Sequence, residues 1–518
     1  MPVTTGIVIA GAGFSGIGMG IALKKAGYHD FVILEKDHDL GGTWRDNQYP
    51  GCACDVPSPL YSYSYELNPS WTRMFAPQRE IWDYLRMCAR KYGVGEHIRY
   101  GCAVEQMDWD DAAQCWHVGT GHRKNGHTEN SHTENGHTEN GDAGTGPIET
   151  GPIETGRAKG YRARAVVSAG GALHIPSYPD IPGAARFAGA SFHSARWDHS
   201  CDLTGKQVAV IGTGASAVQF IPEIAAQVAR LRVFQRTPPW VHPRPDVEIP
   251  PRVRSTLGAS PLAARVLRDA IYWMLEARAL GFAVHPRLMA PLAAVGRRHM
   301  ENQVSDPELR AKLTPDYTIG CKRILLSSSY YPALQRPNVD LVTDPITAIT
   351  PTGIVTADGT DHPADVIIYA TGFKVIESVT ALNVTGRGGR KLAHVGPEAY
   401  HGITVAGFPN FFMLLGPNTA LGHTSVVFMI ESQVQHVLSC LRILARDRAD
   451  TIEVHEDALR RFNRRLQRRL GRAVWSAGGC TSWYLDADGV NRALWPGFSF
   501  EYWARTRRAR RGAYAVGR

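Results

Sequence analysis

Residues 6–16 read Gly-Ile-Val-Ile-Ala-Gly-Ala-Gly-Phe-Ser-Gly, and this stretch decides the fold of the 518-residue chain. Its mainly apolar first half predicts a short buried strand, and a complete G-x-G-x-x-G turn follows directly. Helical sequence continues to Ala26, and a second apolar strand, residues 31–34, ends before Glu35. A strand, glycine turn, helix and strand in this order predict a βαβ unit that binds a dinucleotide.

Each position of the turn has a physical reason. Gly11 permits the tight turn, Gly13 lets the backbone approach a pyrophosphate, and Gly16 lets the helix pack on the strand. The free N–H groups at the start of the helix then face the phosphates. Glu35 is placed to accept hydrogen bonds from ribose hydroxyls. The candidate cofactor contacts of this unit are Gly11, Gly13, Phe14, Ser15, Gly16 and Glu35.

The same pattern returns in the middle of the chain, where a strand over residues 208–211 precedes the turn Gly-Thr-Gly-Ala-Ser-Ala at residues 212–217. Arg236 lies 24 positions after the first glycine of this turn, and Glu35 lies 24 positions after Gly11. A carboxylate repels a 2′-phosphate, whereas a guanidinium binds it bidentately. The first site is therefore predicted to bind FAD and the second to bind NADPH. The candidate contacts of the second site are Gly212, Gly214, Ala215, Ser216, Arg236 and Thr237.

Two βαβ units predict an α/β fold of two Rossmann-like dinucleotide-binding domains. We expect residues 1–170 and 366–518 to form the FAD-binding domain and residues 171–365 the NADP-binding domain. Residues 245–315, rich in Ala, Leu and Arg with helical periodicity, predict a helical insertion in the second domain. The polar repeats within residues 119–158 predict a disordered loop insertion. Residues 424–444 predict a helix with Thr424 as its N-cap.

Composition limits the remaining possibilities. The net charge is +9, and five arginines within residues 505–511 predict a solvated, frayed terminus rather than a nucleic-acid site. No apolar run reaches the ~20 residues of a transmembrane span, and no secretion signal is visible. Nine scattered cysteines indicate free thiols in a reducing cytoplasm, and no metal site is expected because Cys52 and Cys54 lack a second ligand pair. Monomer and dimer both remain open.

Residues 187–198, just before the second βαβ unit, read Phe-Ala-Gly-Ala-Ser-Phe-His-Ser-Ala-Arg-Trp-Asp. This F-x-G-x-x-x-H-x-x-x-W-D pattern resembles the fingerprint of type I Baeyer–Villiger monooxygenases, a family of class B flavoprotein monooxygenases. The residues that carry the pattern are Phe187, Gly189, His193, Trp197 and Asp198.

Further motifs extend the resemblance almost from end to end. Residues 41–44, Gly-Gly-Thr-Trp, look like the family segment that lies against the flavin, and residues 55–58, Asp-Val-Pro-Ser, match its D-V-x-S stretch. Residues 320–323, Gly-Cys-Lys-Arg, resemble G-x-K-R, residues 370–373 match A-T-G-F, and residues 482–483 resemble a mobile-loop pair. The resemblance adds these candidate site residues: Gly42, Thr43, Trp44, Asp55, Lys322, Arg323 and Trp483.

The resemblance also implies roles for these residues. Lys322 would help to hold the NADPH 2′-phosphate, and Trp483 would contact NADP. NADPH would reduce FAD, oxygen would add at the flavin C4a carbon, and the peroxyflavin would attack a ketone to give an ester or lactone. Arg323, charged at any working pH, would stabilise the developing negative charge, and Asp55 would orient it.

Two alternatives stay open. A class B monooxygenase could instead oxidise sulfur or nitrogen, or the chain could bind flavin and NADPH without oxygenation, as a redox sensor or diaphorase. A disulfide reductase is disfavoured because the sequence has neither C-x-x-C nor C-x4-C. The helical insertion and the C-terminal loops are expected to form the substrate pocket, and no motif there identifies the ketone.

Overall fold

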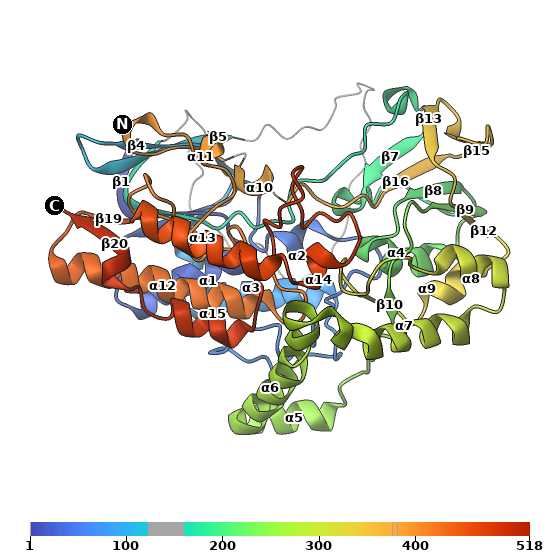
Figure 1. Ribbon diagram of the computed structural model, residues 1–518, viewed down its shortest axis with the longest axis horizontal. Coiled ribbons are helices and arrows are strands. Elements are labelled where there is room, and N and C mark those ends of the chain that lie inside the picture. Colours follow the sequence, from blue (N-terminus) through green and yellow to red (C-terminus); the bar gives the residue numbers. More distant parts are fainter. Residues whose placement is uncertain (1, 123–159, 376, 381) are drawn as a thin grey trace, which may run out of the picture.

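The computed structural model of the chain describes residues 2–122, 160–375, 377–380 and 382–518. Its core consists of two sheets that lie side by side along the molecule (Figure 1). The predicted α/β fold with two Rossmann-like units is confirmed. Most of the predicted loop insertion lies outside the described residues, but residues 119–122 belong to a regular strand. The prediction of a disordered loop is therefore wrong for residues 119–122.

The first sheet has the order β17-β4-β5-β6-β1-β2-β3, and β18 adds to β6. Its strands are β1 (Val3–Ala10), β2 (Phe31–Leu34), β3 (Ile98–Arg99), β4 (Cys102–Asp110), β5 (Cys115–His122), β6 (Tyr161–Ser168), β17 (Asn383–Thr385) and β18 (Phe411–Met413). The strands β6, β1, β2 and β3 run parallel, as a doubly wound sheet requires. Helices α1 (Phe14–Lys25) and α12 (Val426–Asp447) pack together beside this sheet.

The second sheet has five parallel strands in the order β12-β9-β8-β16-β7. Its strands are β7 (Ala190–His193), β8 (Gln207–Ile211), β9 (Arg230–Phe234), β12 (Val339–Val342) and β16 (Val366–Tyr369). The predicted domain boundary between residues 365 and 366 is wrong, because β16 pairs with both β8 and β7 inside this sheet. All four residues of β16 are buried, as both faces of a parallel sheet are covered.

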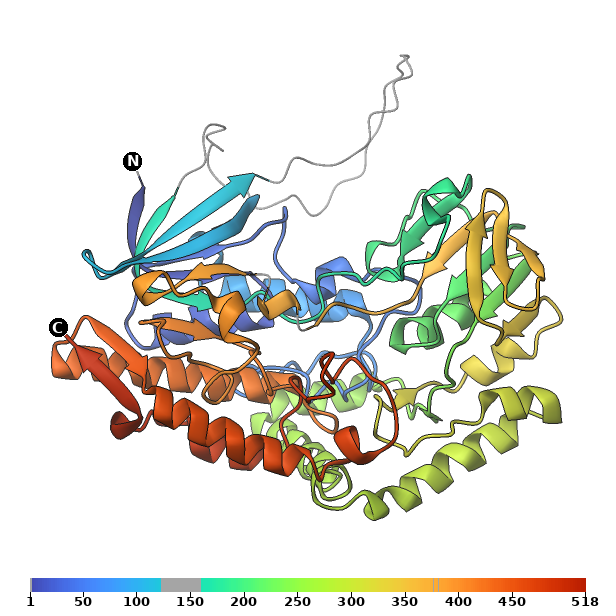
Figure 2. The same cartoon turned by 45° about the horizontal axis from the view of Figure 1, so that its top comes forward.

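The expected helical insertion consists of α5 (Pro251–Ala259), α6 (Pro261–Glu276), α7 (Ala290–Gln303) and α8 (Pro307–Leu313). In Figure 2 it runs along the bottom of the molecule, from the centre to the side of the second sheet. Ser260 caps α6 by accepting from the Ala263 amide at 3.2 Å. The buried carboxylate of Glu276, at the end of α6, accepts from the Ser499 hydroxyl at 2.8 Å. The insertion thus leaves the second sheet and is anchored on the C-terminal part of the chain.

Two details near the C-terminal end differ from the prediction. The N-cap of α12 is Ser425, whose hydroxyl accepts from the Val427 amide, so the cap lies one residue after Thr424. The chain end is ordered rather than frayed, because β20 (Tyr514–Gly517) pairs with β19 (Thr451–Val454). Among the described residues, no helix is long and apolar enough to cross a membrane.

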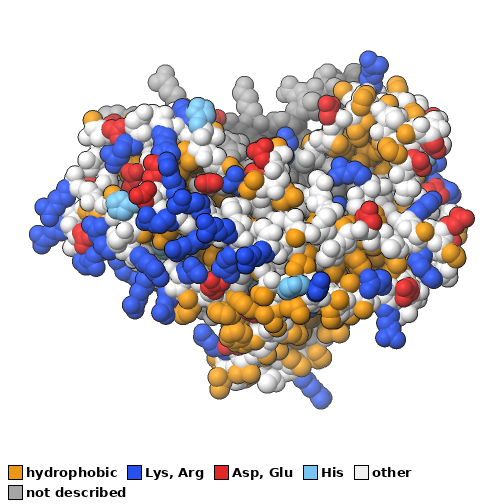
Figure 3. Space-filling view, viewed as in Figure 1, with side chains coloured by type: hydrophobic (Ala, Val, Ile, Leu, Met, Phe, Trp, Pro, Cys, Tyr) orange, Lys and Arg blue, Asp and Glu red, His pale blue; other side chains and the backbone are white. Residues whose placement is uncertain are grey.

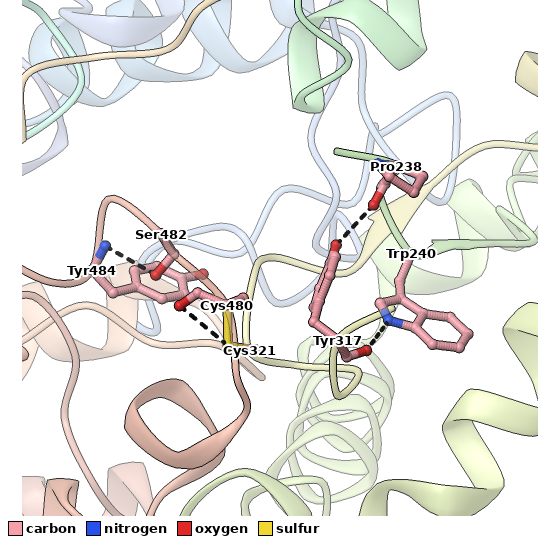
Figure 4. Close-up of a disulfide and its surroundings, with 7 residues drawn as sticks. All are labelled: Pro238, Trp240, Tyr317, Cys321, Cys480, Ser482 and Tyr484. Atoms are coloured by element: carbon pink, nitrogen blue, oxygen red, sulfur yellow. Dashed lines mark hydrogen bonds between the residues drawn. A yellow bond between two sulfur atoms is a disulfide. The ribbon is translucent and has the colours of Figure 1, made fainter. Parts of the chain in front are cut away.

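Two of the cysteines are not free thiols. Cys321 and Cys480 form a disulfide, with their Cα atoms 6.1 Å apart and 159 positions apart in sequence (Figure 4). Local spacing could not indicate this pair, because such a long separation is set by the fold alone. The bond ties residue 321, next to Lys322 and Arg323, to the loop that carries Trp483 and Tyr484.

We expect the denatured, unreduced protein to contain seven reactive thiols, because nine cysteines are present and two are joined. Titration with a thiol reagent in denaturant, before and after reduction, measures this. Replacing Cys480 by Ser should release Cys321 and give eight thiols without a reductant. Nine reactive thiols in the unreduced wild type, protected from reductant throughout purification, would contradict the disulfide.

Candidate active site between the two sheets

A cavity of about 600 Å³ runs between the two sheets. It starts beside Glu35 and Lys36, passes the beginnings of α1 and of α4 (Ala215–Ile224), and reaches Arg323. The candidate residues that line it are Gly11, Gly13, Phe14, Ser15, Glu35, Gly42, Thr43, Trp44, Asp55, Ala215, Ser216, Arg323 and Trp483. The structure therefore brings both glycine-rich turns and the arginine–aspartate pair to one elongated space.

The first turn has the geometry that its glycines predict. Gly11 has a φ of +108°, and a Cβ there would lie 2.7 Å from the Ala169 carbonyl oxygen. A Cβ at Gly16 would lie 1.9 Å from the Gly11 carbonyl oxygen, so Gly16 packs the helix on the turn and does not line the cavity. No side chain caps α1, which leaves its first amides available to phosphate oxygens.

Glu35 is held rigidly at the end of β2. Its buried carboxylate accepts from the Ala12 amide at 2.8 Å and from the Arg45 guanidinium at 2.9 Å. These bonds fix the carboxylate beside the cavity, where it can accept from ribose hydroxyls. Arg45 was not predicted as a site residue. No pattern marks it, because it meets Glu35 only through the fold.

The segment after Leu40 forms the wall opposite the first turn. Gly42, with a φ of +53°, brings its backbone close to Gly13, since a Cβ at Gly42 would lie 3.3 Å from the Gly13 Cα. Thr43 begins the short helix α2 (Thr43–Asp46), and the buried Trp44 donates to the Tyr61 hydroxyl at 3.1 Å. Gly42, Thr43 and Trp44 thus line the cavity beside the first turn, together with Tyr61.

Arg323 and Asp55 meet although they are 268 positions apart. The guanidinium donates to one carboxylate oxygen from Nε at 2.9 Å and from Nη2 at 2.6 Å, and Nη1 donates to the Leu421 carbonyl at 3.2 Å. The Asp55 charge raises the pKa of Arg323 above its ordinary value. The three hydrogen bonds fix the guanidinium in position. The arginine side chain is still 29 % exposed, so it remains open to the cavity.

Tyr484 is a cavity residue that the sequence reasoning missed. Its side chain is buried, and burial raises the pKa of the phenol to about 12, so the phenol stays neutral. The nearby positive charge of Arg323 opposes this rise in pKa. Tyr484 follows Trp483, which was predicted, and no independent signal in the sequence pointed to it.

The expected 2′-phosphate site lies just outside this cavity. Arg236 is exposed after the end of β9, and its charge contributes to lowering the pKa of Lys322, behind the larger effect of burial. Neither side chain has an ion pair among the described residues. The Thr213 hydroxyl donates to the Thr237 carbonyl at 3.4 Å, which joins the second glycine turn to the same corner. Two neighbouring cations without a carboxylate ligand fit a dianionic phosphate.

The second turn repeats the geometry of the first. Gly212 has a φ of +106°, and a Cβ there would lie 2.6 Å from the Ala370 carbonyl oxygen. Gly214 begins α4 without a side-chain cap, and Ala215 and Ser216 line the cavity. The backbone amides at the start of α4 are therefore placed to bind a second pyrophosphate.

None of the five fingerprint residues lines the cavity. A Cβ at Gly189 would lie 2.3 Å from the Asp365 carbonyl oxygen, so only glycine lets this linker run beside β16. Phe187 packs in the core on one side of the second sheet. Asp198 accepts from the Ser200 amide at 3.0 Å and forms a surface turn. These residues shape the connection between the two sheets.

His193 and Trp197 are the aromatic part of that connection. The fully buried His193 ring lies 5.4 Å from the Tyr178 ring and 5.8 Å from the Phe373 ring, and its Nδ1 accepts from the Ala195 amide. Trp197 lies edge-on to Phe220 at 5.2 Å, on α4. The fingerprint thus contacts both the A-T-G-F segment and the second βαβ unit.

Burial lowers the pKa of His193 to about 4, from an ordinary value of 6.5. Between these values a falling pH protonates the unfolded chain but not the folded one. We therefore expect this residue to lower the free energy of unfolding by about 1.4 kcal/mol for each pH unit of acidification in this range. Urea unfolding at about pH 7 and about pH 5 measures the fall in the free energy of unfolding between the two pH values. This fall should be smaller in His193→Asn than in the wild type. The exposed His199, in the same linker, supplies the control, because His199→Gln should keep the wild-type pH dependence.

The expected role of the helical insertion in the cavity wall is wrong. No described residue of the insertion lines the cavity, because α6 and α7 lie below the sheets, whereas residues 483–484 and 492–493 of the C-terminal loops do line it. Among the described residues, no group of three or more His, Cys, Asp or Glu side chains is arranged to hold a metal ion.

Comparison with known proteins agrees with this architecture. The NAD(P)-binding Rossmann-like domain family matches residues 9–84, and the pyridine nucleotide-disulphide oxidoreductase family matches residues 151–265. A closed crystal structure of cyclohexanone monooxygenase aligns with a TM-score of 0.83 over 100% of this chain and 99% of that chain, at 25% identity. Oxidised steroid monooxygenase bound to NADP aligns with a TM-score of 0.82 over 99% and 100%, at 28% identity.

Two Rossmann-like sites that share one cavity define an oxidoreductase that uses FAD and NADPH. A Baeyer–Villiger monooxygenase of Pseudomonas aeruginosa is 46% identical over 98% of this chain and 90% of its own length. A Baeyer–Villiger monooxygenase of Streptomyces coelicolor is 43% identical over 98% and 92%. The chain belongs to the Baeyer–Villiger monooxygenases, flavin-dependent enzymes that use NADPH and oxygen to convert ketones into esters or lactones.

Proposed function

We propose that this enzyme oxygenates a ketone at the Arg323 end of the cavity and that Arg323 and Asp55 are its catalytic pair. The observation that carries the proposal is the double hydrogen bond between them, which fixes a permanent cation on the cavity wall. The first sheet with the C-terminal helices would bind FAD, and the second sheet would bind NADPH. The reaction would take place in the cytoplasm, where NADPH is supplied.

The residues present fit FAD. The cavity passes from Glu35, where a ribose could bind, along the uncapped start of α1 to Arg323. The cavity passes both Gly13 and Trp44, and the absence of a side chain at Gly13 lets the backbone approach a pyrophosphate there. When bound, reduced flavin activates oxygen and supplies the oxygen atom that enters the product.

The protein contributes a preorganised charge at the reacting centre. Attack on a ketone carbonyl moves negative charge onto oxygen, and a guanidinium that is already oriented stabilises that charge without reorganisation. Asp55 keeps the guanidinium in place, and the neutral Tyr484 phenol beside it adds a hydrogen-bond donor. Trp483, on the same loop, partly covers this end and would help to exclude water.

Apolar residues line much of the cavity, among them Val56, which follows Asp55, and Leu421, whose carbonyl accepts from Arg323. A neutral, largely hydrocarbon ketone is therefore the substrate class that fits, because a charged substrate would lose its hydration without a partner. Asp55 already balances the charge of Arg323.

A panel of cyclic, linear, aryl and steroid ketones tests the proposal, with oxygen uptake and mass spectrometry of the products. Ester or lactone that gains one oxygen atom from ¹⁸O₂ is the expected result. An aryl methyl sulfide and a tertiary amine in the same assay test the sulfur and nitrogen alternatives. Oxygen uptake that yields only hydrogen peroxide with every ketone would overturn the proposal.

A disulfide reductase would need a cysteine pair beside the flavin. The only disulfide among the described residues joins Cys321 to Cys480, and neither of them lines the cavity. Cys321 is fully buried beneath the loop that carries Tyr484 (Figure 4). Flavin passes electrons to a disulfide by direct attack on sulfur, which requires the disulfide to face the cavity. The Cys321–Cys480 pair does not face it.

A further inference from the structure

A second cavity, of about 750 Å³, lies away from the active site, between α13 (Glu456–Leu470) and the C-terminal segment. It is lined by seven arginines, which are Arg461, Arg465, Arg468, Arg469, Arg472, Arg505 and Arg510. Figure 3 shows Lys and Arg side chains gathered over this part of the surface. We call it the arginine cavity.

The charge of the arginine cavity is mostly uncompensated. Glu501 accepts from Arg469 at 2.8 Å and from Arg505 at 2.7 Å. The other five arginines have no ion pair among the described residues. Arg461 and Arg465 also stand one turn apart on α13, and like charges at this spacing destabilise a helix. The fold therefore carries an electrostatic cost that a bound anion would remove.

The floor of the arginine cavity carries a separate sign of a missing ligand. His401 is 6 % exposed, and its buried Nδ1 has no hydrogen-bond partner among the described residues. The ring lies 4.6 Å from the Phe462 ring, which also lines the cavity. A buried polar atom without a partner is costly, and a ligand or a ligand-bound water in the cavity would satisfy it.

We propose that the arginine cavity binds a small phosphorylated molecule of nucleotide size that carries at least two phosphate groups. Guanidinium groups bind phosphate oxygens bidentately, and five free ones suit several phosphates rather than a single carboxylate. The cavity is concave and has a closed floor of buried residues such as Leu466 and Ala513, so it accommodates a compact ligand. A nucleic-acid duplex would instead need an extended contact surface.

The site is connected to the active-site loop. Arg472 and Trp495 line the arginine cavity, while Trp483 and Tyr484, between them in sequence, line the active-site cavity. A ligand in the arginine cavity would therefore contact both ends of the loop over residues 473–494. This consequence rests on the proposed function of Trp483 and Tyr484, whereas binding to the arginines does not.

Calorimetric titration of the FAD-loaded enzyme with ATP tests the binding. Low salt keeps screening weak. NADP⁺ is left out because it also carries phosphate groups and would compete for the arginine cavity, and ATP that enters the NADP site binds all three proteins alike and is subtracted. We expect saturable binding that Arg461→Gln/Arg465→Gln weakens at least tenfold. The matched control is Arg460→Gln/Arg464→Gln, which removes the same charge from the same helix outside the cavity and should bind like wild type.

Absence of ATP binding would overturn the proposal, and so would equal weakening by both double variants, which would reveal attraction to net charge alone. Binding of a short DNA duplex through Arg461 and Arg465 without binding of ATP would also overturn it. Amide exchange tests the connection. ATP should slow exchange in residues 473–494 of the wild type and of the control, but not of the Arg461→Gln/Arg465→Gln variant, and unchanged exchange on ATP binding would refute the connection.

Discussion

Arg323→Ala is expected to abolish ester formation while FAD remains bound and NADPH still reduces the flavin. The guanidinium is the cation that Asp55 holds on the cavity wall, and alanine leaves that wall without a charge. A single preorganised charge commonly supplies about a hundredfold or more in rate. Product analysis measures the loss, and stopped-flow absorbance separates flavin reduction from the later steps.

Two further variants separate charge from placement. Arg323→Lys keeps a cation but cannot form both bonds to Asp55, so we expect partial activity. Asp55→Asn keeps the arginine but removes the charge that orients it, so we expect a slower reaction with normal flavin reduction. Ester formation by Arg323→Ala at a near wild-type rate would refute the catalytic assignment. FAD content and thermal unfolding of each variant show whether a loss reflects the site rather than the fold.

The two nucleotide sites were predictable from local sequence because their physics is local. A tight turn needs Gly11, a close helix needs Gly16, and the residue at the end of the next strand faces the ribose. All of these lie within a single βαβ unit. The structure places Glu35 at the cavity as expected. What local sequence could not show is that Arg45 binds the same carboxylate from the following segment.

The pairing of Asp55 with Arg323 was predictable only from the family resemblance. Asp55 and Arg323 meet across 268 positions, and neither has a periodic or spacing signal of its own. The Cys321–Cys480 disulfide has the same cause and no such resemblance to reveal it, so free thiols were wrongly expected. Long-range pairs of this kind depend on how the sheets and loops pack. Local patterns in a single sequence do not predict that packing.

Composition misled us at the C-terminus for a different reason. A run of arginines usually marks a solvated tail, but here Tyr514 bonds to the buried His436 at 2.6 Å and Arg511 pairs with Asp447 at 3.0 Å. Specific partners on α12 therefore order the chain end. The fingerprint shows a different case, since its His193 and Trp197 do not line the cavity and pack instead on Phe373 and Phe220. Sequence patterns identified which residues matter and not whether they contact the ligand.

Arg236→Ala and Lys322→Ala are each expected to raise the Michaelis constant for NADPH about ten- to hundredfold. A charge-assisted hydrogen bond to the 2′-phosphate is worth about 1.5–3 kcal/mol, and about 1.4 kcal/mol corresponds to a factor of ten. Because the charge of Arg236 already lowers the pKa of Lys322, the two cations are close enough for their effects to be non-additive in the double variant.

NADH separates the loss of a 2′-phosphate contact from a general disturbance of the fold, because NADH lacks the 2′-phosphate. We expect its Michaelis constant to stay unchanged in both variants, so that the preference for NADPH over NADH falls. Arg232→Ala is the matched control, since Arg232 lies on β9, four positions before Arg236, and donates to the Gln207 side chain at 3.0 Å. It should leave the NADPH constant as it is. An unchanged Michaelis constant for NADPH in Arg236→Ala would contradict the assignment of Arg236 and Lys322 to the 2′-phosphate. The preference for NADPH would then have to come from the residues around Ser216, which line the cavity.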